Sequence, residues 1–252
     1  MLKFFRKIRK DLLAKNRFSK YLFYALGEII LVVLGILIAL QINNWNERRK
    51  TVDRQEKLLV SLLSDAQTTQ KRLTQSQEIA ESINTDLLHF LDMIRNQKLS
   101  VPIDTLKTYT SMVFQVANFK PALSAYETAL STGDIGLVKN DDLLDAYIQF
   151  KDNYEWFELH QKISGDMVYL GNVWEFRKKL GSTRIFMNGM GSYPTSFELS
   201  DEDFYELLQE KETFATFESR QWLIRNQYDA LIRADDANQK ILKYIKNMLD
   251  EE

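Results

Sequence analysis

Two histidines, His89 and His160, are the side chains best suited to acid–base chemistry or metal binding, and the chain has no others. They fall on different predicted helices. A helical metal pair that begins at a histidine needs a second ligand three or four residues further along the chain, and only His89 has one, Asp92. An acid at that spacing is common by chance. We therefore expect both histidines to be structural or solvent-exposed.

Other residues that could do chemistry lack the arrangement that the chemistry needs. The acids at 201–203 and 235–236 do not follow the order of a calcium-binding loop, and the stretch Asn188–Ser192, "NGMGS", lacks the Gly-Lys-Ser/Thr ending of a phosphate loop. No Gly-x-Ser-x-Gly nucleophile elbow occurs. The absence of cysteine excludes disulfides, thiolate metal sites and cysteine nucleophiles. The sequence predicts neither an enzyme nor a bound cofactor or metal.

Charge is distributed unevenly along the chain. Residues 1–20 carry eight Lys or Arg and one Asp, whereas the whole chain has a formal net charge of −2, so the remainder is acidic. An acidic body argues against a nucleic-acid partner. The basic N-terminus is better explained by attraction to the surface of a lipid bilayer.

Residues 21–45, "YLFYALGEIILVVLGILIALQINNW", predict a transmembrane helix. Ten of the twelve residues Ile29–Leu40 are Ile, Leu or Val, which contributes about −3 to −6 kcal/mol to insertion and outweighs a cost of about 2.5 to 3.5 kcal/mol for the acid Glu28. A helix from Tyr21 to Ile42 is about 33 Å long, enough to cross the hydrocarbon. A cleaved signal peptide is the alternative, but no small-x-small site follows the run.

The flanks of this segment predict its orientation. Tyr21, Tyr24 and Trp45 are typical of residues at the membrane–water interface. Because eight Lys or Arg precede the segment and five follow it through Leu58, the positive-inside rule favours a cytoplasmic N-terminus. We expect a basic cytoplasmic N-terminus at 1–20, a transmembrane helix at 21–45, and an extracytoplasmic domain at 46–252, periplasmic in a bacterial inner membrane.

Glu28, Gly35 and Ala39 share one helical face, since 100° per residue brings the three within about 20° of each other. Gly35-x-x-x-Ala39 is a small-x-x-x-small pair that lets another helix approach closely. One hypothesis is that this stripe packs against a second transmembrane helix, from the same protein or from a partner, with Glu28 paired in the seam. The alternative is that Glu28 only reaches the headgroup region or Lys20.

The basic N-terminus followed by "GEIILVVLGILIALQINNWNE" (Gly27–Glu47) and a long helix resembles a family of uncharacterised bacterial single-pass membrane proteins known only as a domain of unknown function. The resemblance is strongest over residues 1–50 and looser over Tyr126–Phe157. It implies a single-pass envelope protein. It implies no activity, substrate or catalytic residue.

The sequence after residue 45 predicts an all-α helical bundle with one long heptad-patterned helix. Gly and Pro, which interrupt helices, are scarce in it. Apolar or small residues recur at spacings of three and four from Leu59 to Ile94, with polar Thr69 and Ser76 in the middle. Packing inside a bundle is favoured over a parallel oligomeric coil. Further helices are predicted at 104–116, from Pro121 to Thr132, after an Asn140 cap, at 201–213 after a Ser200 cap, and at 216–249. The stretch Gly181–Ser200 is expected to be irregular.

Three functions remain open. The favoured one is a non-catalytic interaction or scaffold protein of the cell envelope, acting as a homo-oligomer or as a subunit with other membrane proteins. The second is an accessory subunit of an ion-driven membrane complex that uses Glu28. The third is an extracytoplasmic ligand sensor, whose signal would have to pass through a partner because only about twenty residues are cytoplasmic.

Overall fold

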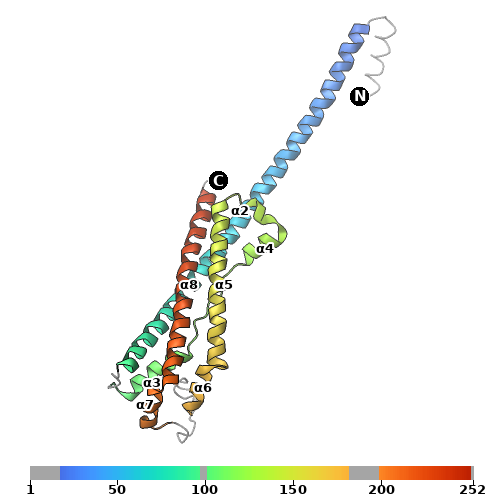
Figure 1. The fold of residues 1–252 in the computed structure, drawn as a ribbon. Coiled ribbons are helices and arrows are strands. Elements are labelled where there is room, and N and C mark those ends of the chain that lie inside the picture. Colours follow the sequence, from blue (N-terminus) through green and yellow to red (C-terminus); the bar gives the residue numbers. More distant parts are fainter. Residues whose placement is uncertain (1–17, 97–100, 182–198, 251–252) are drawn as a thin grey trace, which may run out of the picture. The chain divides into compact units, whose positions relative to one another are not determined.

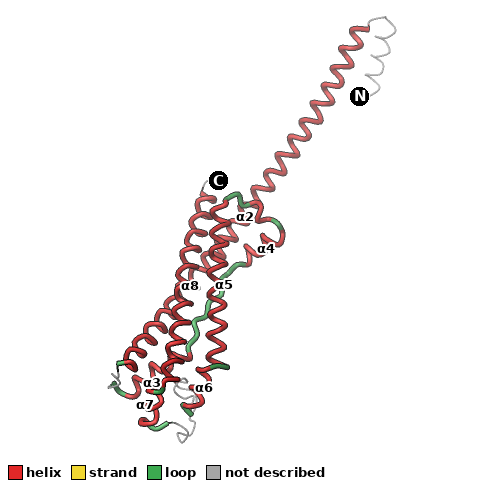
Figure 2. Tube along the Cα trace, viewed as in Figure 1, coloured by secondary structure: helices red, strands yellow, loops and turns green. Residues whose placement is uncertain are grey.

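The structure, a computed structural model, describes residues 18–96, 101–181 and 199–250, and these residues form helices and loops without a strand (Figures 1 and 2). They divide into two units, Met1–Lys57 and Leu58–Glu252. The prediction of an all-α fold, with a long apolar N-terminal helix and a helical bundle, is confirmed.

Helix α2 extends over Phe18–Arg95 and supplies all the described residues of the first unit. No Gly or Pro occurs between Gly35 and Pro102, so nothing in the sequence removes a backbone donor or loosens the helix. Two consecutive asparagines, Asn43 and Asn44, are poor helix formers at which this helix could have broken. Both residues are helical.

In the second unit, three helices form the bundle: α2 from Leu58 onward, α5 (Asp141–Tyr169) and α8 (Lys211–Asp250). Side-chain amides connect α8 to α2 at two levels, Asn238 to the Ala66 carbonyl (3.0 Å) and Gln221 to Asn84 (2.9 Å). Because the α2 number rises as the α8 number falls, these two helices are antiparallel. The same reversal relates α5 to α8, where Arg233 meets Asn153 and Lys240 meets Gln149.

The heptad positions of α2 face the bundle interior. All but the last are buried: Leu59, Leu62, Ala66, Thr69, Leu73, Ser76, Ala80, Ile83, Leu87 and Phe90, followed by half-buried Ile94. They join two apolar clusters, one containing Phe150 and Phe157 of α5 and the other containing Phe217 of α8. This confirms packing within a bundle, so this seam is occupied by the chain itself.

Four short helices close the ends of the unit: α3 (Ile103–Ser111), α4 (Ser124–Thr132), α6 (Asn172–Lys179) and α7 (Asp201–Gln209). The predicted caps form: Asn140 Oδ1 accepts from the Leu143 N–H (2.9 Å), and Ser200 Oγ accepts from the Asp203 N–H (3.1 Å). Gly133 has a φ of 79°, the left-handed conformation in which glycine avoids the steric cost of a Cβ.

Four helix boundaries differ from the predictions. The helix predicted at 104–116 ends at Ser111 and is followed by a 3-10 turn, Met112–Phe114, and the helix predicted at 216–249 begins at Lys211. A helix beginning at Pro121 is wrong, because α4 begins at Ser124 and Pro121 lies in extended chain. The helix predicted at 201–213 ends at Gln209, because Glu210 has an extended ψ of 137°. Of the irregular stretch Gly181–Ser200, residues 182–198 lie outside the described part.

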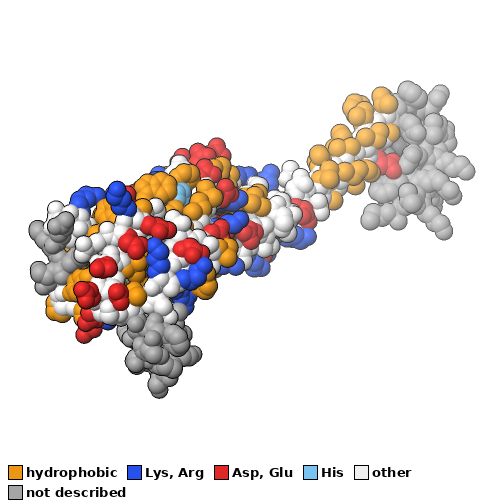
Figure 3. All heavy atoms as spheres, turned by 60° about the horizontal axis from the view of Figure 1, so that its bottom comes forward, with side chains coloured by type: hydrophobic (Ala, Val, Ile, Leu, Met, Phe, Trp, Pro, Cys, Tyr) orange, Lys and Arg blue, Asp and Glu red, His pale blue; other side chains and the backbone are white. Residues whose placement is uncertain are grey.

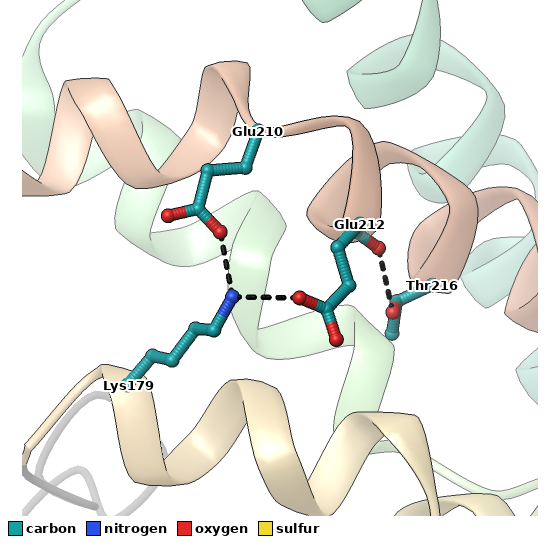
Figure 4. Close-up of polar contacts among 4 residues, drawn as sticks. All are labelled: Lys179, Glu210, Glu212 and Thr216. Carbon is teal, nitrogen blue, oxygen red and sulfur yellow. Dashed lines mark hydrogen bonds and ion pairs between the residues drawn. The ribbon is translucent and has the colours of Figure 1, made fainter.

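A lysine of α6 forms ion pairs with two acids at the junction between α7 and α8 (Figure 4). Lys179 Nζ donates to Glu210 Oε2 (2.6 Å) and Glu212 Oε2 (2.9 Å), and the Thr216 hydroxyl donates to the Glu212 carbonyl (2.9 Å). The two carboxylates, Glu210 first, raise the pKa of Lys179. One ammonium thus offsets the repulsion of two acids at a helix junction.

Candidate interaction sites

The N-terminal part of α2 exposes its apolar side chains on every side. An 18-residue window within it has a mean hydropathy of 2.5, and none of that window is buried inside the chain. Figure 3 shows hydrophobic side chains covering its visible face, whereas charged groups of both signs are mixed over the second unit. A helix this long and apolar is a candidate membrane span.

Glu28, Gly35 and Ala39 all lie in this part of α2, with Glu28 half-buried and the other two exposed. A Cβ placed on Gly35 would have no neighbour within 4 Å. The small face is therefore open to another helix. Of the proposed interfacial anchors, Trp45 is exposed, and Tyr21 and Tyr24 belong to α2 but their side chains lie outside the described part.

An extended segment, Gln115–Leu123, hereafter called the strap, runs along the bundle between the short helices that precede and follow it (Figure 2). Ala117, Phe119 and Pro121 are buried, while Asn118 and Lys120 are exposed. This alternation is typical of extended backbone. The Phe119 ring meets Tyr154 and Phe157 of α5 edge-on, with centroids 5.8 Å apart in both pairs.

Side chains of α2 bind the backbone of the strap, in the way that a neighbouring strand binds the backbone of a β-strand. Carbonyls of alternate strap residues accept hydrogen bonds: Asn118 from Ser76 (2.9 Å), Lys120 from Arg72 (3.0 Å) and Ala122 from Thr69 (3.1 Å). Thr69 and Ser76 interrupt the apolar heptad seam because their hydroxyls donate hydrogen bonds to carbonyls of the strap.

Arg220 of α8 fixes the beginning of the strap from the other side. It is fully buried, and its three nitrogens donate to the Val113 carbonyl (3.0 Å), the Gln115 carbonyl (2.5 Å) and Ser164 Oγ (2.8 Å). No carboxylate of the described residues pairs with it. Burial lowers the pKa of Arg220 to about 10, as expected for a desolvated cation.

A groove follows the outer seam between α5 and α8, and its lining combines apolar Ile163, Met167, Trp222 and Leu223 with polar Glu218, Ser219 and Gln221. We call it the aromatic groove and define it by Trp156, Ile163 and Met167 of α5 together with Trp222 of α8. The part between Ile163 and Trp222 has a volume of about 620 Å³. Trp156 is 46% and Trp222 58% exposed. Trp156 lies at the edge of the buried aromatic cluster that contains Phe150 and Phe157.

Both histidines have structural surroundings. His160 is buried beneath the aromatic groove, with ring centroids 4.5 Å from Trp156 and 5.9 Å from Trp222, and its Nδ1 lies 2.8 Å from the Trp156 carbonyl. His89 is exposed and lies 5.3 Å from the ring of Tyr109. Within the described residues, no three His, Asp or Glu side chains gather as metal ligands would.

These features define an all-helical bundle with a candidate membrane helix. A search with family models matched residues 28–207, well over half of the chain, to a family of unknown function, DUF6090. The chain belongs to this family, which confirms the resemblance, and the match takes in Tyr126–Phe157. Searches of curated proteins and of solved structures found no match.

Proposed function

We propose that the chain is a non-catalytic, membrane-anchored interaction protein of the bacterial cell envelope, acting as an oligomer or as a subunit of a larger membrane complex. The observation that carries the proposal is the aromatic groove. Its tryptophans are exposed, although Phe150 and Phe157 of α5 are buried. Exposed Trp in a groove is the residue type most enriched among binding hot spots.

The shape of the groove fits a helical partner. Helix α5 lines the groove with apolar residues at spacings of seven and four, namely Trp156, Ile163 and Met167. The seam between α5 and the antiparallel α8 leaves room for a third helix. A partner helix with apolar residues at matching spacing would cover both tryptophans. Water would leave the exposed indole surfaces, which is the main driving force of such docking.

The proposed location rests on the candidate membrane helix and on charge. A basic N-terminus before the apolar segment favours a cytoplasmic N-terminus in the inner membrane, with the bundle in the periplasm. The acidic body speaks against nucleic acid as a partner. The proposal of a non-catalytic role is supported by the structural surroundings of both histidines.

The test compares two tryptophan variants of the full chain purified in mild detergent. Trp222→Ala removes the exposed side of the groove, and Trp174→Ala, on α6 and outside the groove, is the matched control. We expect the mass of the native complex, from multi-angle light scattering, to fall for Trp222→Ala and to stay unchanged for the control. A wild-type chain that is monomeric at all concentrations, with no co-purifying chain, would contradict the proposal.

A further inference from the structure

A second hollow, separate from the aromatic groove, lies beside the strap and has a volume of about 460 Å³. Arg72, Gln75 and Ser76 of α2 form one side, Asn118 and Lys120 of the strap another, and Gln161 of α5 the third. This volume is within the range of small-molecule sites, about 300 to 1,000 Å³. It is larger than a single inorganic ion requires.

The hollow is cationic and rich in hydrogen-bond donors. Neither Arg72 nor Lys120 contacts a carboxylate of the described residues, and no Asp or Glu borders the hollow. Three side-chain amides complete it. The Gln161 amide donates to Asn118 Oδ1 (2.7 Å), which fixes the orientation of both groups. Two cations without a counter-ion favour an anionic ligand.

The strap backbone adds two further donors. Ser76 and Arg72 hold the carbonyls of Asn118 and Lys120, but the N–H groups of these two residues have no acceptor in the described part of the chain. In extended backbone the N–H and C=O of one residue point to the same edge. Both N–H groups are therefore directed toward the α2 edge, where the Arg72 guanidinium lies.

We propose that this hollow binds a small hydroxylated acid, a sugar acid or a sugar phosphate. The carboxylate or phosphate is held by the Arg72 guanidinium, the Lys120 ammonium and the Lys120 backbone N–H, and the amides of Gln75 and Gln161 bind hydroxyls. A guanidinium fork matches either oxyanion. The proposal goes beyond the interaction role and does not depend on the aromatic groove.

The experiment measures binding of four probes to the full chain in detergent by isothermal titration calorimetry. The probes are glucuronate, glucose 6-phosphate, neutral glucose and inorganic phosphate. We expect glucuronate, glucose 6-phosphate or both to bind. Neutral glucose lacks the anionic group and inorganic phosphate lacks the sugar hydroxyls, so both should bind at least tenfold more weakly. Glucuronate alone would assign a carboxylate ligand, and glucose 6-phosphate alone a phosphate ligand.

Lys120→Gln removes one cation without altering the strap carbonyl that Arg72 holds, so the fold is kept. It should weaken binding at least tenfold, whereas Lys151→Gln, on the exposed face of α5 outside the hollow, should leave binding unchanged. Equal binding by glucose or by phosphate alone would overturn the proposal. The proposal would also be overturned if neither acid bound at probe concentrations up to about 10 mM, or if Lys120→Gln left their binding unchanged.

Discussion

Thr69 and Ala122 are joined by a reciprocal pair of hydrogen bonds, although 53 residues separate them. The Ala122 N–H donates to Thr69 Oγ1 over 2.9 Å, and the same hydroxyl donates to the Ala122 carbonyl over 3.1 Å. One buried side chain of α2 thus satisfies both backbone groups of a strap residue, as a neighbouring strand would. This pairing holds the chain extended at Pro121 and delays the start of α4 to Ser124.

Thr69→Val tests this relationship, since valine has the shape of threonine without the hydroxyl. Two backbone groups lose their partner, and we expect the free energy of unfolding to fall by about 1 to 3 kcal/mol. The measurement is urea unfolding of the full chain in detergent. Thr74→Val is the matched control, because its exposed hydroxyl only donates to Gln70 one turn earlier, and it should change stability by less than about 0.5 kcal/mol. Equal effects of the two variants would contradict this role of Thr69.

Arg220→Met should be more costly. Methionine has a similar length, but it leaves the Val113 and Gln115 carbonyls without the donor that Arg220 supplies, whereas the Ser164 hydroxyl still accepts from Gln227 (2.8 Å). Replacing a buried charge by an apolar group is tolerated when its partners are replaced too; here they remain. We expect a loss on the order of 3 kcal/mol in the same unfolding measurement.

The control for this variant is Arg225→Met, which removes an exposed arginine of the same helix that pairs with Asp229 at 3.1 Å. It should cost less than about 1 kcal/mol. A chain whose stability is unchanged or raised by Arg220→Met would show that the guanidinium does not hold the strap.

The Tyr147 hydroxyl gives a prediction about pH. It is buried without a hydrogen-bond partner among the described residues, and it stacks on Tyr126 with centroids 4.3 Å apart. Burial, and then the charge of Asp65, raise the pKa of Tyr147 well above its ordinary value of 10.0. Above pH 10 the unfolded chain therefore loses this proton first, and the folded state loses stability at up to about 1.4 kcal/mol per pH unit.

Tyr147→Phe removes the titrating hydroxyl and with it this loss of stability at high pH. The variant should be at least as stable as the wild type at pH 7, because no hydrogen bond is lost. Its free energy of unfolding should exceed that of the wild type by a growing amount between about pH 9 and about pH 11. The lowered pKa of Arg220 acts in the opposite direction, but it is common to both chains and cancels in the comparison. A pH-independent difference in chemical unfolding would contradict the assignment.

The seam of α2 and the caps could be predicted because they depend on local spacing. Leu59 to Phe90 keep the periods of three and four that bring side chains to one face, and Asn140 and Ser200 are cap residues in sequence as in structure. Thr69 and Ser76 appeared only as weak points. Their acceptors are carbonyls more than forty residues away, and the amino-acid types do not encode which carbonyl will arrive there.

Sequence reasoning missed two features, one that had a local signal and one that had none. Arg220 lies between Phe217 and Ile224, at spacings of three and four on the buried face of α8, so an arginine in an apolar stripe could have marked it as a buried donor. Glu210 is a good helix former, and nothing at that position announces the break between α7 and α8. The break depends on Lys179, which arrives from α6.

Gly35→Leu tests the proposed packing face of the membrane helix. A Cβ at Gly35 has no neighbour within 4 Å among the described residues, so a change in self-association is best explained by contacts between chains. We expect Gly35→Leu and Glu28→Ala each to weaken association of the full chain, measured by energy transfer between labelled copies in vesicles. Leu37→Ala, on another exposed face of the same helix, should have little effect. If neither substitution on the Glu28–Gly35–Ala39 face changes association and no partner helix is recovered, this face does not pack.

The most direct test of the whole account is whether the apolar part of α2 anchors the chain in lipid. Membranes carrying the full chain are extracted with alkaline carbonate, and the N-terminal sequence of the mature protein is determined. We predict that the chain stays in the membrane pellet with residues 21–45 intact, and that removing residues 1–57 releases a folded helical domain into the supernatant. A full chain found in the supernatant, or a mature protein that begins after residue 42, would contradict the account.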